Sequence, residues 1–199
     1  MMKIYAHRGA SGFYPENTML AFEKALEAKS DGIELDVQLT ADGEVVIFHD
    51  ETLERTTDGT GRVYDHSLAE LKRLNAAAFY RGGKEVHTIP SFDEYCAWVA
   101  TTDLITNIEI KNSIIYYPEL EEKVLALVAK YDLAEKVFIS SFNHLSLVRC
   151  KELNSAIPCG VLVPESGLVN AGLATSLFGF EYFHPPYVAL SEELIAECH

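Results

Sequence analysis

Gly32-Ile33-Glu34-Leu35-Asp36-Val37 is a short apolar run that carries two carboxylates. In a strand, side chains two positions apart point to the same face, so Glu34 and Asp36 project together while the aliphatic residues face the other way. Adjacent carboxylates repel each other unless a cation or a shared proton lies between them. An edge strand with a solvated polar face explains the same pattern, and the stretch alone does not separate the two interpretations.

Strand-like and helix-like segments alternate on both sides of this stretch. The predicted strands are 3–7, 32–37, 44–50, 104–111, 137–142, 159–163 and 180–184, and the predicted helices begin near 17, 67, 91, 118, 143, 170 and 191. Repeated alternation predicts an α/β fold with a mainly parallel sheet. About seven strands over this length favour a TIM-type (β/α)8 barrel over an open sheet.

The alternation is interrupted in one region. No helix fits between the strands at 32–37 and 44–50, and residues 51–90 are too long for an ordinary connecting loop. A capping box at Ser67 and Glu70 predicts one short helix there, through Leu74. We interpret 51–90 as a small insertion within a single domain that spans residues 1–199.

Composition narrows the function classes. The 199 residues carry a formal net charge of −14, which argues against nucleic acid or an anionic membrane as the main partner. Four scattered cysteines fit reduced thiols in a cytoplasmic protein better than a disulfide framework or a zinc cluster. We see no signal peptide and no apolar window that is long enough to span a membrane.

Chemically capable side chains recur at the predicted strand ends, where parallel barrels gather their catalytic groups. Each has an ordinary structural explanation, but that explanation is hard to sustain for all of them at once. The set is His7, Arg8, Glu34, Asp36, His49, Glu109 and Lys111.

Together these side chains indicate a reaction class. Oxygen ligands without cysteine suit one hard divalent cation, Mg2+ or Ca2+. Arg8 and Lys111 can hold a phosphate-like group, and two histidines can divide general acid and general base work. These parts describe metal-assisted hydrolysis of a phosphate ester.

At these residues the chain resembles the glycerophosphodiester phosphodiesterase family. The resemblance implies a TIM-type barrel with its insertion at about 51–90, and hydrolysis of a small-molecule glycerophosphodiester to sn-glycerol 3-phosphate and an alcohol. It also implies that Glu34, Asp36 and Glu109 bind the metal, that His7 and His49 are the acid/base pair, and that Arg8 and Lys111 contact phosphate. Asn17 would support the loop around His7. The matching segments are His7-Arg8-Gly9, Pro15-Glu16-Asn17-Thr18, Glu34-Leu35-Asp36-Val37 with Thr40 and Asp42-Gly43, His49-Asp50, Arg55-Thr56-Thr57, Ile89-Pro90-Ser91-Phe92, Glu109-Ile110-Lys111, Ser141-Phe142 and His184-Pro185.

The C-terminal part departs from that family. Members usually continue with strands resembling Trp-Thr-Val-Asn and Gly-Ile-Ile-Thr-Asp-x-Pro, and neither is present. We therefore expect a barrel that is incomplete at its C-terminus, through truncation, natural shortening or a homo-oligomer that covers the open edge. Two alternative functions remain: a phospholipase-type hydrolase acting on lysophospholipid or sphingolipid, and a catalytically silent binding protein.

Overall fold

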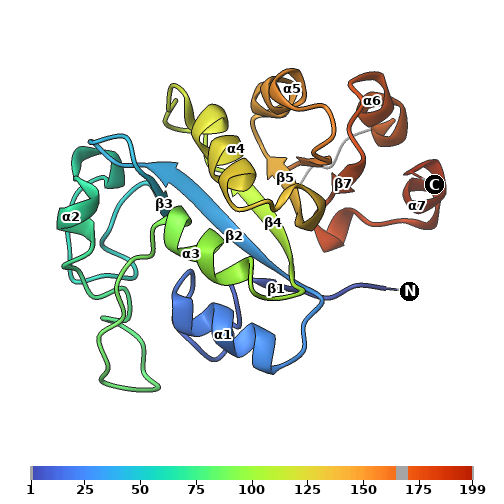
Figure 1. Ribbon diagram of the computed structural model, residues 1–199. Helices are drawn as coiled ribbons and strands as arrows, with labels where there is room; N and C mark the ends of the chain where they lie inside the picture. The colour runs from blue at the N-terminus through green and yellow to red at the C-terminus, as the bar shows by residue number, and fades with distance from the viewer. Residues whose placement is uncertain (1, 165–169, 199) are drawn as a thin grey trace.

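The computed structural model describes residues 2–164 and 170–198 and has the predicted alternation of strands and helices (Figure 1). The strands are β1 (Tyr5–His7), β2 (Gly32–Leu39), β3 (Val45–Ile47), β4 (Ile105–Ile110), β5 (Val137–Ser141), β6 (Cys159–Leu162) and β7 (Tyr182–His184). The α-helices are α1 (Met19–Glu27), α2 (Leu68–Leu71), α3 (Phe92–Val99), α4 (Leu120–Lys130), α5 (His144–Leu153), α6 (Ala171–Leu177) and α7 (Glu192–Cys198). Three-residue 3-10 helices lie at Val63–Asp65, Ala134–Lys136 and Tyr187–Ala189.

One sheet, in the order β1-β2-β4-β5-β6-β7, organises the fold. These neighbours all pair in parallel, whereas β3 pairs antiparallel with β2, because a tight turn and no helix joins them. Within the described residues, β1 and β7 form the two ends of this sheet and do not pair with each other. The sheet curls with helices packed along it, and the fold is a TIM-type barrel that is open between these two strands.

The strand that bears Glu34 and Asp36 lies inside this sheet. β2 pairs with β1 and, further along the strand, with β3 on one side, and with β4 on the other. All eight of its residues are buried. The interpretation of this strand as a solvated edge is therefore wrong, because paired neighbours cover both of its edges. Its carboxylates are held in a place where charge is costly.

The aliphatic side chains of β2 build the main core. Ile33, Leu35 and Val37 are fully buried and pack with Phe22 of α1 and Tyr95 of α3. Burial of such side chains contributes roughly 1.5–3 kcal/mol each. The alternation of β2 thus places its apolar half against the helices and leaves its polar half for the opposite face of the sheet.

Helix starts follow the predicted caps. Thr18 caps α1 by accepting a hydrogen bond from the Ala21 amide, and Ser91 with Glu94 forms a complete capping box on α3. Helix α2 also has its capping box, but it ends at Leu71 and not at Leu74. Beyond Leu71 the amides of Arg73 and Leu74 donate to carbonyls three residues back, so the chain continues as a tighter turn to Leu74. The Asn75 amide then donates to the Asp58 carboxylate, 2.8 Å away.

The excursion at 51–90 has a small core of its own. Two of its members, Val46 and Phe48, come from β3 and the residue just beyond it, so the excursion is attached to the sheet where β3 ends. In Figure 1 it forms the part of the molecule around α2, beside β3. The buried residues of this cluster are Val46, Phe48, Leu53, Val63, Leu71, Ala76 and Ile89.

The structure also describes the state of the cysteines and the character of the helices. The four cysteines are free, and Cys96, Cys150 and Cys159 are buried. In the described part of the chain, no helix combines the length and apolar character needed to cross a membrane.

Candidate active site

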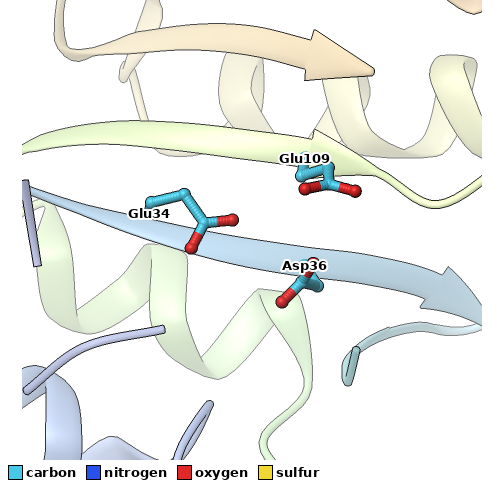
Figure 2. Close-up of side chains that lie close together, drawn as sticks. All are labelled: Glu34, Asp36 and Glu109. Atoms are coloured by element: carbon cyan, nitrogen blue, oxygen red, sulfur yellow. The ribbon is translucent and has the colours of Figure 1, made fainter. Parts of the chain in front are cut away.

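Three carboxylates meet where β2 and β4 lie side by side. Asp36 and Glu109 are register partners across these strands, and Glu34 lies two residues before Asp36 on the same face of β2. One oxygen from each carboxylate lies within 4.8 Å of the others, and the three residues are 0 to 9% exposed. Figure 2 shows the three carboxyl groups on the same face of the two strands.

This cluster is unfavourable without a counterion. Burial raises the pKa of Glu34 well above its usual range, and the charges of Asp36 and Glu109 raise it further. Burial and the Asp36 charge likewise raise the pKa of Glu109. Among the described residues, Glu34 Oε1 and Asp36 Oδ1 are buried side-chain oxygens without a hydrogen-bond partner. Buried orphan acceptors of this kind are what a bound cation would satisfy.

The spacing of the oxygens suits a hard cation. With ligands at about 2.4 Å, two oxygens on opposite sides of Ca2+ lie about 4.8 Å apart, and those around the smaller Mg2+ lie closer together. The donor set consists of carboxylate oxygen, which both ions prefer. Glu34, Asp36 and Glu109 therefore fit a single divalent cation of this class.

Two basic residues border the carboxylates. Lys111 Nζ donates to Glu109 Oε1 at 2.9 Å and lies 3.8 Å from Asp36 Oδ1. Arg8 Nε lies 3.4 Å from Asp36 Oδ2, and the Arg8 backbone amide donates to Glu34 Oε2 at 2.9 Å. Both predicted phosphate-binding residues thus lie beside the carboxylate cluster.

Asn17 makes hydrogen bonds to two parts of the site, through its backbone and through its side chain. Its backbone amide donates to the carbonyl of Arg8 at 3.0 Å, which ties down the loop after His7 as expected. Its side-chain amide also donates to Asp36 Oδ2 at 2.8 Å, a contact that sequence reasoning did not anticipate. Asn17 therefore orients one of the carboxylates as well as the loop.

The two predicted acid/base histidines differ in their surroundings. His7 closes β1, its side chain is 68% exposed, and its Nε2 lies 3.8 Å from Glu34 Oε2. Burial of its inner part and the Arg8 charge lower the pKa of His7. His49 lies two residues beyond β3, and its Nδ1 lies 2.5 Å from Asp50 Oδ1.

Gln38 holds the backbone that carries His49. The side-chain amide nitrogen of this fully buried residue donates to the carbonyls of Phe48, His49 and Asp50, and its oxygen accepts from the Tyr117 hydroxyl at 2.8 Å. Sequence reasoning missed Gln38. The signal was present, because the period-2 alternation of Glu34 and Asp36 continues to this position.

Three charged residues around the site were also missed as contributors. Arg55 donates to the carboxylates of both Glu16 and Asp50, and these two lie next to Arg8 and His49. They occur in the quoted motifs Pro15-Glu16, His49-Asp50 and Arg55-Thr56, but sequence spacing does not show that they meet.

Comparison with known families agrees with this geometry. The glycerophosphoryl diester phosphodiesterase family matches residues 7–175. The chain belongs to this family. Its members are hydrolases, so this chain belongs to an enzyme family. All the predicted strand-end residues lie inside the matched region.

Individual relatives cover most of the chain. A glycerophosphodiester phosphodiesterase from Caldanaerobacter subterraneus is 41% identical over 195 residues, which is 98% of this chain and 80% of that protein. One from Bacillus altitudinis is 48% identical over 167 residues, 83% of this chain and 68% of that protein. The solved structure of an Oleispira antarctica phosphodiesterase in complex with the product sn-glycerol-3-phosphate has a TM-score of 0.83 at 30% identity, covering 100% of this chain and 80% of that one.

Proposed function

We propose that this member of the glycerophosphodiester phosphodiesterase family hydrolyses glycerophosphodiesters to sn-glycerol 3-phosphate and an alcohol, with one divalent cation, Mg2+ or Ca2+. The observation that carries the proposal is the buried cluster of Glu34, Asp36 and Glu109, with two orphan carboxylate oxygens and basic residues beside it. The Oleispira antarctica phosphodiesterase, solved with sn-glycerol-3-phosphate, supports the product.

The carboxylates and the basic residues divide the binding work. Glu34, Asp36 and Glu109 would hold the cation, which when bound polarises a phosphoryl oxygen and offsets negative charge in the transition state. Lys111 and Arg8 lie within 4 Å of Asp36, so their charges border the same place. They would bind the anionic phosphate group and offset the repulsion between that group and the three carboxylates.

The histidines would move protons. One of His7 and His49 takes the proton of the attacking oxygen, and the other gives a proton to the oxygen of the departing alcohol. A neutral His49 that donates its Nδ1 hydrogen to Asp50 has its Nε2 lone pair free as a base. A protonated His49 would donate from Nδ1 to the same carboxylate and carry the proton to be given on Nε2, so the contact is compatible with either role.

A single assay tests this function. The protein is incubated with glycerophosphocholine and Mg2+ or Ca2+, and release of glycerol 3-phosphate is followed with and without EDTA. We expect release that depends on the metal. An unchanged rate after chelation would contradict the carboxylate site.

The same assay distinguishes the alternatives. Turnover of lysophospholipid or sphingolipid, with none of soluble diesters, would replace the proposed substrate class by the phospholipase-type one. Binding of metal and substrate without any turnover would indicate a binding protein. The single domain of residues 1–199 and a homo-oligomer that covers the open edge stay predictions, which limited proteolysis and a measured mass in solution would test.

A further inference from the structure

Arg55 lies in the excursion after β3, six residues beyond His49, and its guanidinium faces two carboxylates from separate loops. Its Nε and one terminal nitrogen donate to Asp50 at 2.5 and 2.9 Å. Its two terminal nitrogens donate to Glu16 at 2.8 and 2.7 Å. A planar guanidinium that makes four hydrogen bonds in two pairs leaves both carboxylates little freedom to rotate.

Each of these carboxylates also contacts a proposed site residue. Asp50 Oδ1 lies 2.5 Å from His49 Nδ1, and Glu16 Oε1 accepts from a terminal nitrogen of Arg8 at 2.9 Å. The charges alternate from Arg8 through Glu16 and Arg55 to Asp50, and His49 is the last member. Arg55 thus joins the loop after β1 to the segment after β3.

The electrostatics agree with a charged network. Although burial opposes it, hydrogen bonds from Arg55 and His49 lower the pKa of Asp50 to about 2. Burial is likewise outweighed at Glu16, where Arg55 and Arg8 lower the pKa. The two carboxylates are therefore ionised at neutral pH. Without Arg55 the two carboxylates would lose the cation that bonds to both of them.

We propose that Arg55 is a positioning residue for catalysis: it holds Asp50 so that His49 keeps its Nδ1 hydrogen and presents Nε2 to the substrate, and it holds Glu16 so that Arg8 stays aimed at the phosphate. The proposal rests on the proposed function, because His49 and Arg8 are assigned there. Arg55 itself touches neither the carboxylate cluster nor, on this proposal, the reacting atoms. A single isolated ion pair on the surface contributes little to stability. A guanidinium that bonds to carboxylates from two loops also fixes the positions of those loops, and rates depend on such positions.

The chain offers a matched control. Arg149 on α5 is 48% exposed against 47% for Arg55, and it also bridges two carboxylates, those of Glu122 and Glu152. Those partners belong to helices on the outside of the sheet and contact no proposed site residue. Arg149→Met therefore removes a similar surface network without touching the site.

The kinetic test compares Arg55→Met, Arg55→Lys and Arg149→Met with the wild type on glycerophosphocholine. We expect kcat to fall roughly 10- to 100-fold in Arg55→Met, because small misplacements of catalytic groups cost rates of that size. Arg55→Lys should stay close to Arg55→Met, since an ammonium group cannot make the paired contacts. Arg149→Met should keep wild-type kcat.

A chemical rescue separates positioning from folding. Millimolar guanidinium should restore part of the activity of Arg55→Ala, and the same concentration of ammonium should not. Full activity in Arg55→Met, or a loss in Arg55→Ala that guanidinium does not reverse, would overturn the proposal.

A spectroscopic test does not depend on turnover. NMR of the histidine ring nitrogens, with His49 assigned by His49→Ala, should show the neutral ring protonated on Nδ1 in the wild type and in Arg149→Met, and a mixture of tautomers in Arg55→Met. The same single tautomer in Arg55→Met would overturn the proposal. If the wild type hydrolyses no glycerophosphodiester, the proposed function fails, and the tautomer measurement still decides the role of Arg55 on His49.

Discussion

Asp36 and Glu109 are direct register partners on the adjacent parallel strands β2 and β4. Parallel pairing sends both side chains to the same face, so two carboxylates that are 73 positions apart in the chain leave the sheet next to each other. Glu34, two residues earlier on β2, completes the cluster. The fold thus enforces a concentration of negative charge that a cation would relieve.

Removing one carboxylate should weaken cation binding. Glu109→Gln takes a charge and an anionic ligand from the cluster, so we expect the affinity for Ca2+ or Mg2+ to fall by at least about 10-fold. Titration calorimetry on the metal-free protein measures this. Glu122→Gln, on the surface helix α4, is the control and should bind the cation as the wild type does. Equal affinity in Glu109→Gln and the control would remove Glu109 from the site.

Removing a proposed acid/base group should reduce turnover and leave the fold intact. His49→Ala should lower kcat by about 100-fold or more, because positioned proton transfer contributes that much. The change in melting temperature should be small, since the His49 ring is partly exposed. His87→Ala is the control, since its ring lies 3.8 Å from the carboxylate of exposed Glu85 and is not part of the proposed site. A His49→Ala enzyme with near-normal kcat would mean that another group moves the proton.

The loop after β1 should not tolerate a side chain at Gly9. Its φ is +76°, and a Cβ there would lie 2.7 to 2.8 Å from atoms of Ala21. Gly9→Ala should cost about 1–3 kcal/mol of unfolding free energy and lower activity, because the loop carries His7 and Arg8. Gly12→Ala is a control in the same loop, where a Cβ meets nothing within 4 Å, and should change stability by less than about 0.5 kcal/mol. Similar denaturation midpoints for both variants would contradict this account.

Asp50 should make stability depend on acid pH. Its folded pKa is about 2, against an ordinary value of 3.8, so the folded state favours the ionised form. A lowered carboxyl pKa adds stability that is present above pH 3.8 and is lost as the pH falls towards 2. Because the side chain is partly solvated, we expect about 1 kcal/mol. At neutral pH the wild type should exceed Asp50→Asn in unfolding free energy by an amount that includes this contribution. The contribution should disappear from the difference as the pH is lowered towards 2. A difference that stays constant with pH would show that Asp50 gains nothing from its ionic partners.

Local sequence signals predicted most of the elements. Thr18, Ser67 and Ser91 cap helices where expected, because capping depends on hydrogen bonds within a few residues. The end of α2 was placed three residues too late: the amides of Arg73 and Leu74 bond to carbonyls three residues back, and the Asn75 amide then bonds to Asp58, 17 positions away. Ends that depend on distant partners are not visible in local patterns.

The sequence by itself determined the α/β alternation, the broken unit after β2 and the single face shared by Glu34 and Asp36. These follow from side-chain period and turn chemistry, which act between near neighbours. Only the tertiary structure decided that β2 is buried between two strands and that Gln38 holds the backbone at His49. It also decided that Arg55 joins Glu16 to Asp50. Those relationships depend on which strands pair and in which register, because burial and charge act through space between residues that are remote in the chain.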